Sequence, residues 1–87
     1  MKASEIEGRL RRFIQEHYSV PESDGEFTDE VNLFNYGYID SFGAVDLYAF
    51  VEKEFSVHIN ETDLVTIPLN TIREIAAFVA RRHEEVL

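Results

Sequence analysis

Residues 37–47 read GYIDSFGAVDL, in which a glycine-containing loop runs directly into an apolar segment with helical periodicity. A small polar residue before such a segment is typical of a helix start, and the pattern assigns Ser41 as the N-cap. The periodicity continues to about Phe55, which predicts a helix over residues 41–55. The residues predicted to face inward are Phe42, Val45, Tyr48 or Ala49, Val51 and Phe55. Those predicted to face outward are Asp46, Glu52, Lys53 and Glu54.

Another helix is predicted before this stretch, over residues 4–19. Ser4 and Glu7 form an S-x-x-E pattern, the signature of a capping box, and apolar residues follow at helical spacing. Pro21 disfavours helix in the residue before it, so the helix should end just ahead of it. Residues 20–40 then form a long loop, which needs buried anchors to be ordered. The residues expected to provide these anchors are Leu33, Phe34 and Ile39.

Two more helices are predicted after it. Asn60 is an N-cap candidate for a short helix over residues 60–65. Thr71 and Glu74 form a second capping box, which opens a last helix over residues 71–83. Because no alternating strand pattern of useful length is present, the predicted fold class is all-α: a small four-helix bundle with a long first loop and a short third helix.

Composition excludes several classes of function. The 87-residue chain has no cysteine, so no disulfide or thiolate metal site supports the fold, and its length predicts a single domain over residues 1–87. The formal net charge is −9, and nearly all of the excess lies in residues 20–66, where eleven acidic residues stand against one lysine. Such a surface repels nucleic acid and suits fast, reversible encounters with basic partners. No apolar run is long enough to cross a membrane and no targeting segment is visible, so we expect a cytoplasmic protein with no membrane insertion. We also expect a monomer.

Neither a catalytic site nor a metal site is indicated. His17, His58 and His83 are isolated in the sequence, which argues against a Ser-His-Asp hydrolase. No cysteine or paired-histidine set suggests zinc, and the acidic residues lack the spacing of a calcium loop. We therefore expect a protein that is not an enzyme and holds no metal. Ser41 keeps two interpretations at this point: an ordinary helix cap, or a hydroxyl that is used chemically.

The chain closely resembles the acyl carrier protein family, which includes peptidyl and D-alanyl carriers. In that family a D-S-(L/F/M) motif opens the second helix, and residues 40–42 match it as Asp-Ser-Phe. Residues 45–47, Val-Asp-Leu, match the apolar and acidic positions that follow. EKEF at residues 52–55 resembles the end of the second helix, and NTIREI at residues 70–75 resembles the start of the last. The likeness covers nearly the whole chain.

The resemblance implies that Ser41 receives 4′-phosphopantetheine from coenzyme A, with Asp40 and Phe42 flanking the attachment point. The chain would then be a phosphoprotein that carries an acyl or aminoacyl group as a thioester, in lipid or secondary metabolite biosynthesis. The implied partners are a phosphopantetheinyl transferase, an acyl- or aminoacyl-activating ligase, and a downstream acyltransferase or synthase with basic docking surfaces. The residues expected to meet these partners are Asp46, Glu52, Glu54, Glu61 and Asp63.

Some features depart from the housekeeping fatty acid carrier. Gly37 stands three residues before Asp40 rather than two, and Phe42 replaces the usual leucine, which is closer to discrete D-alanyl, aminoacyl or specialised carriers. The second helix is also rich in aromatic residues, and if these fill the interior, little room is left for a long acyl chain. The alternative function is an unmodified acidic helical adaptor that acts only through protein–protein binding. An adaptor would share the fold but would not require serine at residue 41.

Overall fold

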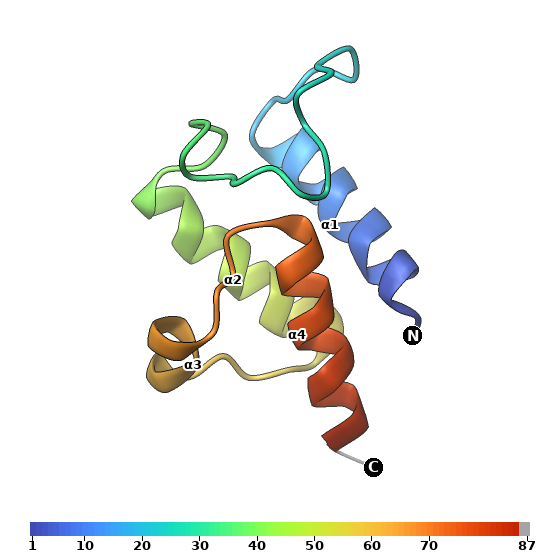
Figure 1. Cartoon of the computed structure of the whole chain (residues 1–87), viewed down its shortest axis with the longest axis vertical. Helices are drawn as coiled ribbons and strands as arrows, with labels where there is room; N and C mark the ends of the chain where they lie inside the picture. The colour runs from blue at the N-terminus through green and yellow to red at the C-terminus, as the bar shows by residue number, and fades with distance from the viewer. Residues whose placement is uncertain (86–87) are drawn as a thin grey trace.

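The computed structural model describes residues 1–85 and contains four helices and no strand in this range (Figure 1). The helices are α1 (Ala3–His17), α2 (Ser41–Phe55), α3 (Glu61–Thr66) and α4 (Ile72–Glu85). α1 and α4 lie side by side and run in opposite directions, and the α1–α2 loop lies over the end of the bundle where α4 begins (Figure 1). The predicted all-α bundle with a long first loop and a short third helix is confirmed.

The core is built from one apolar face each of α1, α2 and α4, with anchors from the long loop. The buried residues of α1 are Ile6, Leu10 and Ile14. Those of α4 are Ile72, Ile75, Ala76, Phe78 and Val79. Leu33 and Ile39 are buried as predicted, whereas Phe34 is only partly buried. Since each fully buried side chain of this size contributes roughly 1.5–3 kcal/mol, packing rather than helix propensity holds the bundle together.

The predicted inward face of α2 is wrong in part. Phe42 is 87% exposed and Val45 is 68% exposed, while Tyr48 is half-buried. The residues of α2 that are buried are Leu47, Val51 and Phe55. Apolar residues occupy most of the circumference of this helix, so the periodicity alone does not distinguish the packed face from the solvent face. As a result, α2 presents exposed apolar side chains directly after Ser41.

Two helix starts follow the predicted local hydrogen bonds. At α3, Asn60 Oδ1 accepts from the Asp63 N–H at 2.8 Å, and Asp63 Oδ2 accepts from the Asn60 N–H at 3.0 Å. Ahead of α4, Thr71 Oγ1 accepts from the Glu74 N–H at 3.0 Å, and Glu74 Oε1 accepts from the Thr71 N–H at 3.1 Å. Both are reciprocal capping boxes, which confirms the N-cap predicted at Asn60 and the capping box predicted at Thr71.

The capping box predicted at Ser4 is wrong. α1 begins one residue earlier, at Ala3, and its N-cap residue Lys2 makes no side-chain cap hydrogen bond. The Glu7 carboxylate, which the box would have used, instead lies 3.4 Å from the Arg73 side chain of α4. A contact between two helices has therefore taken the place of a local cap, which a pattern of four residues cannot reveal.

Hydrogen bonds join the long α1–α2 loop to α1 and to the start of α4. The Arg11 side chain of α1 donates to both carboxylate oxygens of Asp29, at 2.7 and 2.9 Å. The backbone carbonyl of Asp29 accepts from the Arg73 N–H of α4, and the Leu33 N–H donates to the Asn70 carbonyl, both at 2.9 Å. These bonds hold the loop on the bundle and so direct the chain into the first turn of α2.

Candidate functional site

The N-terminus of α2 is capped by Asp40 and not, as predicted, by Ser41. Asp40 has extended backbone angles, and its Oδ1 accepts from the Gly43 N–H at 2.7 Å. Ser41 is the first residue inside the helix, and it is exposed. Both residues are good caps, so the sequence could not decide between them. Because Asp40 caps the helix, the Ser41 hydroxyl has no capping role and lies at the surface of the first turn.

The first turn of α2 fits a phosphodiester on Ser41. The first N–H groups of any helix lack an intrahelical acceptor. In α2 the Asp40 side chain accepts from the N–H of Gly43. Among the described residues, the N–H groups of Ser41 and Phe42 have no acceptor. These N–H groups and the positive end of the helix dipole together favour an anion by about 0.3–1 kcal/mol. The negative charge of the adjacent Asp40 carboxylate opposes this effect. The turn is therefore able to hold an attached phosphate but is not by itself a strong anion site.

Tyr18, which sequence analysis did not single out, packs against this turn. It directly follows α1, and its hydroxyl donates to the Gly43 carbonyl at 2.6 Å. Burial, followed by the charges of Asp46 and Asp40, raises the pKa of the Tyr18 hydroxyl. A Cβ on Gly43 would lie 2.9 Å from Tyr18 Cε1 and 3.0 Å from Ile39 Cγ2. Glycine is thus required at residue 43 for the close approach of Tyr18 to the start of α2. In the sequence, a glycine just inside a predicted helix was the sign of this close contact.

Ser41 shares one side of α2 with residues that contact the α3 region. Val45, Tyr48 and Glu52 follow Ser41 at intervals of three or four residues, which places them on successive turns of one stripe. The Tyr48 hydroxyl donates to the Leu69 carbonyl at 3.2 Å, and Glu52 Oε2 accepts from the Ile59 N–H at 2.8 Å. A hollow of about 330 Å³, lined by Tyr48 and residues 64–70, lies on this side. α3 therefore flanks the side of α2 that carries Ser41.

The predicted docking carboxylates do not form one acidic face. Asp46 and Glu54 face α1: Asp46 Oδ2 lies 3.7 Å from His17 Nε2, and Glu54 pairs with Arg9 at 2.8 Å. Glu52 lies on the α3 side and is already held by the Ile59 N–H. Glu61, at the start of α3, is exposed. Among the predicted carboxylates, Asp46 and Glu61 are the two most available to a partner.

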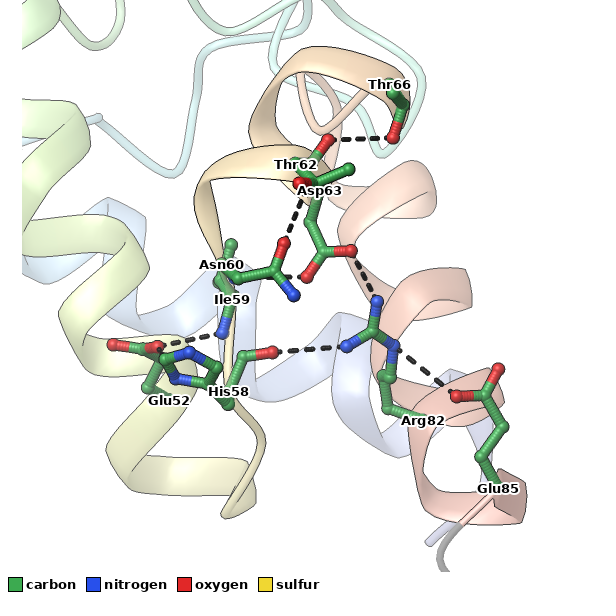
Figure 2. A network of polar contacts seen from close by, with 9 residues as sticks. All are labelled: Glu52, His58, Ile59, Asn60, Thr62, Asp63, Thr66, Arg82 and Glu85. Atoms are coloured by element: carbon green, nitrogen blue, oxygen red, sulfur yellow. Dashed lines mark hydrogen bonds and ion pairs between the residues drawn. The ribbon is translucent and has the colours of Figure 1, made fainter.

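Asp63 is not available to a partner, contrary to the prediction. It is only 5% exposed, and its carboxylate accepts from the Asn60 N–H and forms an ion pair with Arg82 of α4 (Figure 2). The Asn60 N–H hydrogen bond, followed by the Arg82 interaction, lowers the pKa of Asp63 despite its burial. Sequence analysis placed it on the surface because its partner is nineteen residues away in the chain. Its role is structural.

Exposed apolar side chains stand where an acidic face was expected. On α2 these are Phe42 and Val45; on α3 they are Leu64, which is 48% exposed, and Val65, which is 85% exposed. We call these four residues the apolar ridge. Exposed apolar side chains that gather on one side of a protein are typical of protein-binding sites. The exposed neighbours of Ser41 on α2, Phe42 and Val45, are therefore apolar and not acidic.

Other kinds of site are not indicated in the described part of the chain. Within residues 1–85 no group of three or more histidine or acidic residues could hold a metal ion, and no helix is long and apolar enough to cross a membrane. None of the histidines in this range is hydrogen-bonded to Ser41. Within residues 1–85 Ser41 therefore has no histidine base of the kind that activates a serine nucleophile.

Comparison with known families explains this arrangement. No curated protein matches the chain. The model of the phosphopantetheine attachment site family matches residues 9–79, which include the later part of α1, all of α2 and α3, and the first part of α4. Domains of this family are non-catalytic carriers to which 4′-phosphopantetheine is attached, so the predicted cofactor and the absence of an enzymatic role are confirmed. The chain belongs to the phosphopantetheine attachment family of carrier proteins.

Proposed function

We propose that the chain carries an acyl or aminoacyl group as a thioester on a 4′-phosphopantetheine arm attached to Ser41. The observation that supports this most is the place of the Ser41 hydroxyl: exposed, on the first turn of α2, directly after the Asp40 cap and inside the matched region. Asp40 stabilises this turn through Gly43, and Phe42 is the exposed neighbour of the attachment point. We also propose that residues 1–87 form one carrier domain.

The attachment step needs a separate phosphopantetheinyl transferase. Ser41 Oγ forms a bond to phosphorus while the pyrophosphate bond of coenzyme A breaks, and adenosine 3′,5′-bisphosphate leaves. The proton of the hydroxyl passes to a base on the transferase, because no histidine of residues 1–85 is hydrogen-bonded to Ser41. The thiol of the arm then holds the cargo, while this chain supplies attachment and recognition.

Partner docking in this proposal uses the apolar ridge with Asp46 and Glu61 near it. The ridge supplies buried contact area on binding, and the two carboxylates orient a partner that carries basic residues. The proposed partners are the transferase, an acyl- or aminoacyl-activating ligase, and an acyltransferase or synthase that uses the cargo. A cytoplasmic monomer suits such successive encounters, since each one must be reversible.

The cargo we propose is short or aminoacyl rather than a long acyl chain. Of the aromatic residues of α2, Phe42 does not fill the interior, because it is 87% exposed. Phe55 is buried, and Phe50 stacks on Phe13 of α1 with 3.9 Å between ring centroids. These rings occupy the space between α1 and α2. Protection of a long acyl chain inside the acylated protein, seen by NMR contacts with core residues, would contradict this part of the proposal.

The test is intact-protein mass spectrometry after incubation with coenzyme A, magnesium and a broad-specificity phosphopantetheinyl transferase. We expect one added phosphopantetheine on the wild type and on Ser4→Ala, and none on a folded Ser41→Ala. Ser4 is a matched control, because it too is exposed in the first turn of a helix. A folded Ser41→Ala that still gains the arm would refute the site. A wild type that gains nothing from any transferase tried would favour the unmodified adaptor.

A further inference from the structure

α3 has almost no apolar attachment to the bundle. Of its six residues, Asp63 alone is buried, while Leu64 is about half exposed and Val65 is almost fully exposed. The flanking residues Ile59 and Ile67 are partly buried against the core. A helix usually stays in place because an apolar stripe is buried. Here a charged residue occupies the position that such a stripe would take.

The partner of that charge is Arg82 of α4, which reaches several groups around α3 (Figure 2). Its Nη2 donates to Asp63 Oδ1, and its Nη1 donates to the His58 carbonyl, in the segment before α3, at 3.4 Å. Two contacts within α4 hold the guanidinium: Glu85 Oε2 at 3.6 Å from Nε, and the Phe78 ring with its centroid 4.7 Å from Cζ. The guanidinium is thus fixed by its own helix and extends across to α3.

Loss of the ion pair between Asp63 and Arg82 would change the position of α3. A carboxylate that is 5% exposed and has lost its cation must either find water or be protonated. The Asn60 cap bond would remain, since it lies within the α3 turn itself. Asp63 would therefore gain water by moving together with α3, and not by breaking the helix. Leu64 and Val65 would move with it.

We propose that Arg82 is a positioning residue for partner docking: it holds α3 against α4 and thereby sets where Leu64 and Val65 stand relative to Ser41. This rests on the proposed function, in which the apolar ridge is shared between α2 and α3. Arg82 lies on α4 and contacts the side of α3 that carries Asp63, so it acts on the ridge without belonging to it. Its effect on docking passes through the placement of α3.

Hydrogen exchange of the unmodified protein tests the hold on α3. In Arg82→Gln we expect the amides of residues 63–67 to exchange roughly tenfold faster or more, with α1 and α4 little changed. Arg81→Gln is the matched control, since Arg81 is the neighbouring exposed arginine and makes no ion pair within residues 1–85. Arg82→Lys keeps a cation near Asp63 and should restore part of the protection. Equal exchange in Arg82→Gln and Arg81→Gln, or faster exchange over all helices alike, would overturn the proposal.

Modification kinetics test the consequence for docking. With coenzyme A and a phosphopantetheinyl transferase, Arg82→Gln should raise the KM for the carrier by roughly tenfold while kcat stays within about twofold, because the chemistry at Ser41 is untouched. Arg81→Gln should match the wild type. An unchanged KM despite faster α3 exchange would overturn the docking role. If the wild type itself accepts no arm, the proposed function fails and the docking role with it, whereas the exchange data still decide whether Arg82 holds α3.

Discussion

Replacement of Gly43 by alanine is the sharpest test of how the first turn of α2 is positioned. An added Cβ would meet Tyr18 Cε1 at 2.9 Å, Ile39 Cγ2 at 3.0 Å and Asp40 Oδ1 at 3.3 Å. The Tyr18 ring cannot simply turn away, because its hydroxyl is bonded to the Gly43 carbonyl at 2.6 Å. Ile39 is buried and has little room to move. The methyl group must therefore displace packed atoms.

The expected result is a loss of about 1–3 kcal/mol in the free energy of unfolding. Overpacking of this kind costs about 1–3 kcal/mol. A displaced Tyr18 hydroxyl would cost on the order of another 1 kcal/mol. Against these stands a gain of up to about 1 kcal/mol, because alanine is the better helix former. Gly8→Ala is the control: Gly8 lies in α1 with nothing within 4 Å of an added Cβ, so this change should stabilise by about 0.5–1 kcal/mol.

The assay is urea unfolding of both variants and of the wild type, followed by circular dichroism. The two glycine replacements should change stability in opposite directions. In a Tyr18→Ala background the cost of Gly43→Ala should fall, because one of the three contacts is gone. If Gly43→Ala stabilised the protein as much as Gly8→Ala does, the packing of Tyr18 on this turn would be refuted. Gly43 would then have to be explained by something outside the fold.

Two further predictions concern charge and pH. Burial and then the hydrogen bond to Asp24 raise the pKa of Tyr38 to about 12, so the contribution of its neutral form is full below the ordinary tyrosine value of about 10 and is lost as pH rises through about 12. The difference in tyrosinate absorbance between wild type and Tyr38→Phe should therefore titrate near 12; a midpoint near 10 would contradict the hydrogen bond to Asp24. Reversal of Asp46 and Glu54 to lysine should slow modification by the transferase by roughly threefold or more at low salt, with Asp46→Lys the larger effect because Glu54 already pairs with Arg9. Rates that respond to neither salt nor mutation would remove these carboxylates from docking.

Features set by neighbouring residues could be predicted from the sequence. The capping boxes at Asn60 and Thr71 depend on bonds between residues three apart, so a four-residue pattern is enough to find them. The inward faces of α1 and α4 were also predictable, because each helix has one apolar stripe and a polar remainder. α2 has no such contrast, and its packed face is decided by the shape of the bundle around it.

The features of the site that could not be predicted from the sequence depend on contacts between residues far apart in the chain. Asp63 looks like a surface carboxylate until Arg82 is placed beside it, and Gly43 looks incidental until Tyr18 is seen against it. Each pair joins residues 19 or 25 apart in the chain. The motif at residues 40–42 lies at the start of α2, as the sequence predicts, and attachment at Ser41 stays a prediction. Which of Asp40 and Ser41 caps the helix required the hydrogen bond to Gly43.

We infer that this chain works as a carrier through Ser41, and mass spectrometry of the protein isolated from its own cells tests this. Intact and tandem mass spectrometry of the native protein would show whether it bears phosphopantetheine and on which residue. We expect the arm on most molecules, confined to the peptide that contains Ser41, with part of the arms carrying a thioester that hydroxylamine releases. A native protein that is unmodified throughout would contradict the carrier function, and an arm on any other residue would contradict the site.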